Sequence, residues 1–341
     1  MKKSLLLAAL ALLAIENGAM AQVTIDLVNI GNPGNAADTN TLGSVAYNYA
    51  IGKYDVTIGQ YTAFLNAVAA NDSYGLYNSY MGSNNAVGGI TQNGTSGSYT
   101  YTVRSDLGSG HPSEVNLPIA YVSWFDAARF ANWMANGQPT GAQSPTTTEN
   151  GAYTLLGATT GVNFTKNTTN PNTGKAVNWW IPSQNEWYKA AYYDPALNSG
   201  AGGYWLYPTR SNTAPGNVIG STPDNANINY AKNFAVPSGA PYVTDGGAFS
   251  ASASAYGTYD QGGNLYQWND QVISGLYRGE RGGSFRSADA SSLLSSSSTF
   301  ATPTSVSDQI GFRLASVPEP ATWGLLAFGF ASTVIFRRRK H

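Results

Sequence analysis

The sequence predicts a single, irregular, loop-rich α+β domain with few short helices. Only three segments carry signals for the start of a helix, and the stretches of alternating polarity are short. Long Gly- and Asn-rich segments separate these candidate helices and strands. A chain of 341 residues could also hold two smaller domains, and either arrangement would bury a sizeable core. Charged residues make up only 11% of the chain, so a neutral polar surface is expected.

Three segments begin with a capping box, in which Ser or Thr is followed three residues later by Gln or an acidic residue. The pairs are Thr57 with Gln60, Ser123 with Asp126, and Ser183 with Glu186. The first helix should place Tyr61, Phe64, Leu65 and Val68 on one apolar face. The second should end at Gly137, just before Pro139.

The remaining segments indicate short strands and long loops. The sequence "YTYTV", residues 99–103, alternates with a period of two and predicts a strand. The Gly- and Asn-rich stretches around residues 82–97 and 195–226 are expected to be surface loops. Tyrosines within loops, such as Tyr74, Tyr77 and Tyr80, are candidates for exposed recognition residues.

The chain contains no cysteine. Disulfides, thiolate metal sites, cysteine nucleophiles and iron–sulfur clusters are therefore excluded.

The N-terminal stretch "MKKSLLLAALALLAIENGAMAQ" has the layout of a secretory signal. Two lysines precede an apolar run, and Ala19-Met20-Ala21 forms a small-residue cleavage site. We expect residues 1–21 to direct the export of the chain and signal peptidase to remove them.

The C-terminal segment 317–341 reads "VPEPATWGLLAFGFASTVIFRRRKH". Its apolar part, Ala321 to Phe336, has sixteen residues, and Arg337 to Lys340 follow as a basic cluster. One interpretation is a permanent transmembrane tail anchor, although the segment is shorter than the roughly 20 residues that a spanning helix needs.

The order of Pro318-Glu319-Pro320, apolar segment and arginine cluster resembles the PEP-CTERM sorting signal of Gram-negative bacteria. The resemblance implies that an exosortase removes the tail after a transient association with the membrane. It also implies a protein of the cell envelope, outer surface or extracellular matrix, associated with exopolysaccharide. Without both terminal segments the chain keeps 12 of its 18 basic and 17 of its 19 acidic residues, so no nucleic-acid partner is expected.

Six ordered segments between Lys53 and Ser316 resemble landmarks of the formylglycine-generating enzyme, or sulfatase-modifying factor, family. They are "KYDVTIGQYTAFLN", "LPIAYVSWFDAARFANWM", "WIPSQNEWYKAAYY", "YGTYDQGGNLYQW", "RGGSFRS" and "IGFRLAS". The resemblance implies a domain over residues 22–316 with an irregular α+β fold of C-type-lectin-like topology, which calcium supports in many members.

The resemblance also locates the family's copper site. In catalytic members a pair of copper-binding cysteines follows the aromatic residue of the "RGGSF" strand by two and by seven positions. Those positions hold Ser287 and Ser292, which we expect to line a polar cleft beside Ser284. A serine hydroxyl is neither a thiolate nor a soft ligand, so no copper is expected and oxidase activity should be absent.

The sequence also disfavours two other catalytic centres. A branch of the family uses iron held by histidines, but His111 is the one histidine between the two terminal signals, and we expect it to be a structural loop residue. A serine hydrolase is disfavoured because the chain has no Gly-x-Ser-x-Gly motif.

The segment from Tyr259 to Trp268 resembles the family's calcium loop. By position, the ligands would be the side chains of Asp260 and Gln267 and the carbonyls of Gly263 and Leu265. The family usually has Glu where Gln267 stands, and the loss of one negative charge should weaken binding. The alternative is that Asp260 and Gln267 only fix a turn through hydrogen bonds. Asn227 and Ile228 resemble part of a second calcium site.

These observations favour an exported, noncatalytic binding or matrix-associated protein, with an exopolysaccharide or a surface protein as its ligand. The alternative is an enzyme that uses the same cleft, either a sulfatase-modifying type of oxidase with another centre or a hydrolase.

Overall fold

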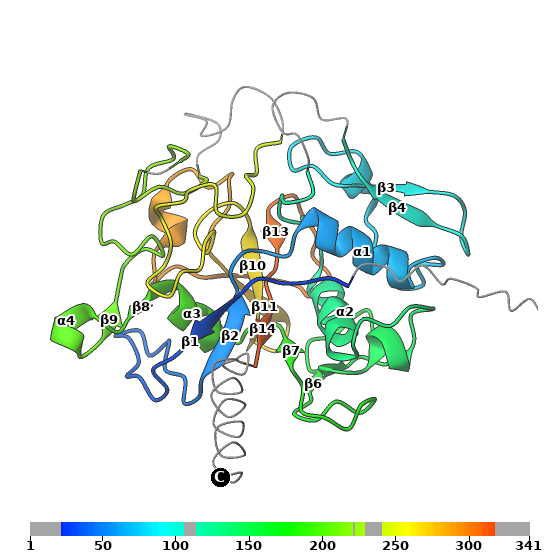
Figure 1. The fold of residues 1–341 in the computed structure, drawn as a ribbon, viewed down its shortest axis with the longest axis horizontal. Coiled ribbons are helices and arrows are strands. Elements are labelled where there is room, and N and C mark those ends of the chain that lie inside the picture. The colour runs from blue at the N-terminus through cyan, green and yellow to red at the C-terminus, as the bar shows by residue number, and fades with distance from the viewer. Residues whose placement is uncertain (1–21, 106–113, 221, 229–240, 318–341) are drawn as a thin grey trace, which may run out of the picture.

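The computed structural model describes residues 22–105, 114–220, 222–228 and 241–317 (Figure 1). The predicted signal segment 1–21, His111 and residues 318–341 of the predicted sorting segment lie outside this range. The helical elements are α1 (Ile58–Val68), α2 (Trp124–Ala135), α3 (Gln184–Tyr192), the single turn α4 (Leu197–Gly200), the 3₁₀ turns η1 (Ser79–Gly82) and η3 (Ala290–Leu293), and the π turn η2 (Pro145–Glu149).

Within the described ranges, strands of two to eight residues make up two four-stranded sheets and three two-stranded ribbons. The first sheet, in the order β1-β2-β14-β7, is antiparallel throughout. The second, in the order β12-β11-β10-β13, includes one parallel pair, β10 with β13. The strands are β1 (Leu27–Ile30), β2 (Tyr49–Gly52), β3 (Ile90–Asn93), β4 (Thr100–Val103), β5 (Tyr153–Thr154), β6 (Thr165–Lys166), β7 (Trp179–Trp180), β8 (Tyr193–Asp194), β9 (Gly203–Tyr204), β10 (Tyr266–Ile273), β11 (Tyr277–Arg281), β12 (Thr299–Ala301), β13 (Ile310–Gly311) and β14 (Ala315–Ser316).

The three predicted capping boxes are all present and start α1, α2 and α3. In α1, the Thr57 hydroxyl accepts a 3.2 Å hydrogen bond from the Gln60 backbone N–H, and the Gln60 side chain accepts one of 2.9 Å from the Thr57 N–H. Helix α2 ends two residues before Gly137, whose φ of +82° is the left-handed conformation that glycine adopts readily after a helix. Local sequence therefore decides where these helices begin and where α2 ends.

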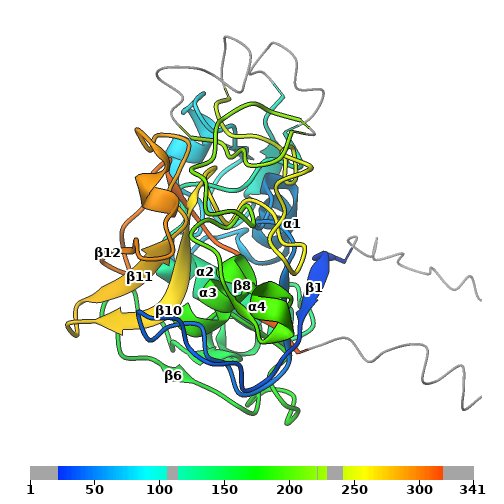
Figure 2. The same ribbon diagram turned by 90° about the vertical axis from the view of Figure 1, so that its left-hand side faces the viewer.

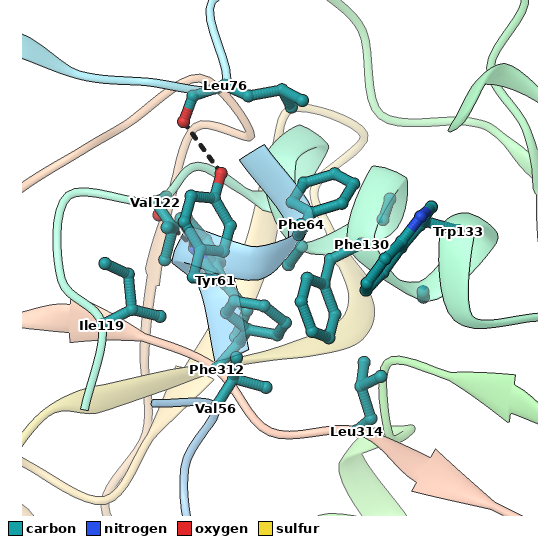
Figure 3. Packing of buried hydrophobic residues seen from close by; sticks show 14 of the residues in the cluster. Val56, Tyr61, Phe64, Leu76, Ile119, Val122, Phe130, Trp133, Phe312 and Leu314 are labelled. Carbon is teal, nitrogen blue, oxygen red and sulfur yellow. Dashed lines mark hydrogen bonds between the residues drawn. The ribbon is translucent and has the colours of Figure 1, made fainter. Parts of the chain in front are cut away.

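The main hydrophobic core lies where α1 meets α2, and the segment around Phe312, between β13 and β14, closes it (Figure 3). The rings of Phe64 and Phe130 meet edge to face with centroids 5.2 Å apart, and Phe312 contacts Phe130 in the same way at 5.4 Å. Tyr61 is fully buried, and its hydroxyl donates a 2.8 Å hydrogen bond to the Leu76 carbonyl. Large aromatic side chains fill a core that has little regular secondary structure around it.

The predicted strand at residues 99–103 is confirmed as β4, but the two expected surface loops contain regular structure as well. Strand β3 lies inside 82–97 and pairs with β4, while α4 and β9 lie inside 195–226. Their Gly and Asn residues form the turns of these short hairpins, such as Gly94 and Gly97 with positive φ between β3 and β4.

The hairpin of β10 and β11 projects from one side of the domain (Figure 2). Ser274 and Gly275, both with positive φ, form its turn. In the described part of the chain, no helix combines the length and the apolar character that crossing a bilayer requires. The predicted apolar segment from Ala321 to Phe336 is not in that part.

Candidate functional site

The three serines predicted to mark the emptied catalytic position follow strand β11. After Arg281, the chain turns through Gly282 and Gly283, whose φ values are +103° and +70°. This turn buries Ser284 completely. Ser292 lies on η3, which brings it back over the same turn.

The hydroxyls of Ser287 and Ser292 converge on Gly283. A Cβ atom built on Gly283 would lie 2.6 Å from the Ser292 Oγ and 3.2 Å from the Ser287 Oγ, and also 2.6 Å from a methyl carbon of Leu293. The two hydroxyl oxygens are therefore no farther apart than the sum of these two distances. Only glycine fits here, because both the positive φ and the close approach exclude a side chain.

The hydrogen bonds of these serines join them mainly to the backbone. The Ser287 Oγ accepts a 3.0 Å hydrogen bond from the Ser284 N–H. The Ser284 Oγ donates to the Gln309 side-chain oxygen at 2.9 Å and accepts from the Arg286 N–H at 3.2 Å. The Ser292 Oγ is buried without a hydrogen-bond partner. Neutral hydroxyls in this arrangement do not fit Cu(I), which prefers soft thiolate ligands.

The predicted calcium loop is held by hydrogen bonds that engage both the oxygen and the NH₂ group of the Gln267 side chain. Gln267 is completely buried. Its side-chain oxygen accepts from the Trp187 indole N–H at 2.6 Å and from the Arg313 Nε at 2.7 Å, and its NH₂ group donates to the Asp260 carbonyl at 2.7 Å. An amide oxygen has two lone pairs, and both are engaged here.

The Gln267 side chain therefore does not fit the role of a calcium ligand in this conformation, since calcium would have to displace an N–H donor and approach a guanidinium cation. The contacts of Gln267 correspond to the alternative given in the sequence analysis, a turn that is fixed by hydrogen bonds. Calcium binding at this loop stays a prediction of the family resemblance, and the contacts of Gln267 argue against it.

Asp260 is half-buried and lies near the buried charges of Asp55 and Arg313. The Asp260 Oδ2 accepts a 2.7 Å hydrogen bond from the Gly247 N–H, and the Asp55 Oδ1 lies 3.5 Å from the Arg313 Nη2. Burial raises the pKa of Asp55 to about 8 and that of Asp260 to about 6, although Arg313 acts in the opposite direction on both. Two carboxylates thus share one guanidinium in a poorly solvated place.

The structure brings the two predicted calcium positions side by side. Asn227 forms a parallel bridge with Gly263, and the Asn227 carbonyl accepts a 3.0 Å hydrogen bond from the Asn264 N–H. The Asn227 NH₂ group donates to the Tyr242 carbonyl and to the Asn264 side chain, both at 2.9 Å. The neighbouring Ile228 carbonyl accepts from the Asn217 side chain at 3.3 Å.

Leu265, whose carbonyl was the remaining predicted ligand, is fully buried in the main core immediately before β10. Within the described ranges, no group of three or more His, Cys, Asp or Glu residues could hold a metal ion. The contacts of Asn227 and Gln267 therefore hold separate segments of the fold together, and apart from the Asp260 carboxylate a metal at either place would depend on carbonyl and amide oxygens.

A separate cavity of about 650 Å³ opens beside the N-terminal segment and the start of α1. Its lining includes three carboxylates, Asp26, Asp55 and Asp245, and neither Lys nor Arg. We call it the acidic cavity. None of the three serines described above lines it. Sequence reasoning missed this cavity because its carboxylates come from distant segments and form no motif.

The three candidate tyrosines differ in exposure. Tyr80 is 58% exposed and stacks on Tyr121 with ring centroids 5.4 Å apart. Tyr74 and Tyr77 are half-buried; the guanidinium of Arg129 lies 4.4 Å from the Tyr74 ring centroid. Of the three, Tyr80 is the most exposed.

The chain aligns in structure with the solved structures of CarF, Treponema denticola variable protein 1 and PvdO from Pseudomonas aeruginosa. CarF is 23% identical, with 87% of this chain and 99% of CarF aligned at a TM-score of 0.46. The T. denticola protein is 16% identical, with 88% and 97% aligned at 0.47. PvdO is 16% identical, with 86% and 92% aligned at 0.42. No curated protein matches the chain.

Two family models match the sequence. The sulfatase-modifying factor enzyme 1-like domain covers residues 17–317, and the PEP-CTERM protein-sorting motif covers residues 316–340. The second motif marks an exported bacterial cell-surface protein that an exosortase processes. Since the first model spans most of the chain, the protein belongs to the family of the sulfatase-modifying factor enzyme 1-like domain and lacks the cysteines of its catalytic members.

Proposed function

We propose that this protein is a noncatalytic binding or matrix-associated protein, exported from a Gram-negative bacterium. The observation that carries the proposal is that the hydroxyls of Ser287 and Ser292 face the same point at Gly283. The family resemblance implies that these are the positions of the copper-binding cysteines of catalytic members. The family scaffold, with its expected C-type-lectin-like topology, is thereby retained without the groups that perform its oxidation chemistry.

The absence of thiol groups supports this proposal more strongly than displaced copper ligands would. Copper-dependent oxidation needs thiolates that hold Cu(I), and a hydroxyl with a pKa far above neutrality cannot replace them. Since the whole chain has no cysteine, no other thiol can substitute from elsewhere in the sequence.

The main rival is an enzyme that uses the same place, and a serine hydrolase is its simplest form. A serine nucleophile needs a neighbouring general base. The hydrogen bonds of Ser284 and Ser287 join them to Gln309 and to backbone N–H groups, none of which is a general base. The contacts therefore favour a structural role for these serines.

The sorting signal suggests where binding takes place. After signal peptidase and exosortase have acted, the domain would reside on the outer surface or in the extracellular matrix, where exopolysaccharide and surface proteins are the available ligands. Calcium at the loop of Asp260 would support the scaffold rather than catalysis, as it does in many relatives of the family described above.

Two measurements on the purified protein test the proposal. Copper content and oxygen consumption with a cysteine-containing sulfatase peptide should both remain at background, and turnover would refute a noncatalytic role. A glycan array, probed with and without calcium, should show binding to saccharides of the exopolysaccharide type. Binding to the producer's own exopolysaccharide would support the matrix role specifically.

A further inference from the structure

The described part of the chain ends in a strand that is paired on both sides. Strand β14 lies between β2 and β7 in the first sheet. Ser316 stands opposite Ala50 on β2 and Trp179 on β7, and its hydroxyl donates a 2.7 Å hydrogen bond to the Asn178 carbonyl. The chain is therefore fixed in the sheet as far as Ser316, and the next residue, Val317, is 43% exposed.

The sorting segment follows this strand directly in the sequence. Its Pro-Glu-Pro motif starts at Pro318, and its apolar run starts at Ala321, four residues beyond Val317. Each residue extends a chain by at most about 3.6 Å, so the apolar run starts within roughly 14 Å of Val317. A domain of about 300 residues is roughly 50 Å across. The connection is therefore short compared with the domain that it carries.

The length of this connection limits how far the domain can stand from a membrane. Both interpretations of the C-terminal segment, sorting signal and tail anchor, place its apolar run in the bilayer, for a time or permanently. The headgroup region on each side of a bilayer is about 5–7 Å thick, and the connection has to cross it. Only a few ångströms of reach then remain, so the part of the domain around Val317 is held next to the headgroups.

The residues around Val317 suit a lipid surface. The segment that leads into β2 and the start of β7 lie beside β14 in the sheet (Figure 1). They supply Tyr47, which is 52% exposed, and Trp179, which is half-buried, and both residue types are enriched where a membrane meets water. The Tyr47 hydroxyl donates a 2.9 Å hydrogen bond to Glu186, which holds the ring in place. We call Tyr47, Asn178, Trp179 and Val317 the tail-end face.

The charges near the tail-end face are compatible with anionic lipids. Residues 46–50 and 175–180 contain no carboxylate, and the exposed Lys175 adds about 1 kcal/mol of attraction to an anionic surface. The carboxylate of Asp38, in the connection from β1 to β2, accepts a 2.6 Å hydrogen bond from a tyrosine hydroxyl. Asp26 precedes β1, at the end of the sheet that lies away from Val317.

We propose that the short connection holds the tail-end face against the lipid headgroups for as long as the apolar run is in the bilayer. Exosortase then cuts the tail of a folded domain that is already seated on the membrane. The opposite side of the domain points away from the lipid; Figure 2 shows β1, the edge strand of this sheet, and β12 on opposite sides. This inference concerns the stage before release, so it stands or falls separately from the proposed binding function.

Single cysteines test this orientation, because the chain has no cysteine of its own. Protein that keeps its tail, produced in cells without exosortase, is placed in vesicles of phosphatidylethanolamine and phosphatidylglycerol that carry a nitroxide quencher on the headgroups. A fluorophore on Asn178→Cys or Asn48→Cys should lose most of its emission, and two positions are used so that one misfolded variant does not decide the result. The matched control is Ser298→Cys, exposed beside β12, which should keep its emission (Figure 2).

A flexible insertion tests whether the short connection is the cause. About 20 Gly and Ser residues between Val317 and Pro318 add a reach of about 25 Å, so the emission at position 178 should largely return. Because the vesicles contain lipid alone, a protein partner cannot produce the quenching. Quenching at position 298 that equals or exceeds that at position 178, or no quenching at either, would overturn the inference. Unchanged quenching after the insertion would also overturn it, since the connection would then not be what holds the face.

Discussion

The side-chain oxygen of Gln267 accepts a hydrogen bond of 2.7 Å from the Nε of Arg313, and both residues are completely buried. This contact joins strand β10 to the segment that leads into β14, across a separation of 46 residues in sequence. Trp187 of α3 donates to the same oxygen. One amide thus connects three parts of the fold.

Removing this amide should destabilise the domain strongly. Gln267→Ala leaves the N–H groups of Trp187 and Arg313 without an acceptor, and each buried unsatisfied donor costs about 1–3 kcal/mol. Urea unfolding should show a lower midpoint for this variant. Gln271→Ala, on the outer part of the same strand, serves as the control and should change the midpoint little. Equal effects of the two substitutions would mean that the shared oxygen contributes little to stability.

The same hydrogen bonds bear on calcium. The family resemblance implies that calcium stabilises the loop, whereas the occupied Gln267 oxygen leads us to expect the same melting temperature in chelator and in millimolar calcium. If the melting temperature instead rises with calcium according to mass action, and Asp260→Ala abolishes the rise, the loop binds calcium despite its hydrogen bonds.

Stability should decrease as the pH rises from about 5 to about 8. Burial raises the pKa of Asp260 to about 6, of Asp126 and Glu280 to about 7, and of Asp55 to about 8. Over this range the folded protein binds more protons than the unfolded chain, whose carboxyl groups titrate near pH 4. The free energy of unfolding is then largest at the acid end of the range and falls as these groups lose their protons.

Glu280→Gln separates one contribution to this pH dependence. The glutamine is neutral throughout, so the decline of the melting temperature between pH 5 and pH 8 should be shallower than in the wild type. Glu280 suits the experiment because it is 4% exposed and burial is the cause of its raised pKa. A wild-type melting temperature that rises over this range would contradict the sign of the prediction.

Gly283→Ala should destabilise the turn that carries the serines. Its positive φ alone costs a non-glycine residue about 1–2 kcal/mol, and the new methyl would lie 2.6 Å from Ser292 and Leu293 atoms. Gly275→Ala is a control with nearly the same φ, +66°, and nothing within 4 Å of its added Cβ. The difference between the two unfolding free energies measures the crowding at the serine pair, and no difference would show that the pair can move apart.

The double variant Ser287→Cys, Ser292→Cys should bind Cu(I) tightly and in a one-to-one ratio. The two hydroxyls already face the same point at Gly283, so two thiolates placed there would form a soft site of the kind that Cu(I) prefers. A Cu(I) titration against the wild type, with each single cysteine variant alongside, provides the measurement. Binding no tighter than that of the single variants would show that the cysteines cannot reach a common ion.

The sequence by itself determined the features that depend on residues close to one another in the chain. The capping boxes at Thr57, Ser123 and Ser183 predicted the starts of α1 to α3, because a cap joins residues only three positions apart. The alternating pattern of residues 99–103 predicted β4, because this pattern too is local in the sequence. The ordered motifs and the missing cysteines were enough to indicate the family and the loss of its copper ligands.

Only the tertiary structure decided which groups surround the side chains of Gln267, Asp55 and Asp245. Gln267 fitted a calcium loop by position, yet its oxygen meets Trp187, 80 residues away, and Arg313. Likewise, Asp55 and Asp245 come to one cavity although no spacing connects them. Whether an oxygen is open to a ligand depends on which donors long-range packing brings to it, and a single sequence does not contain those distances.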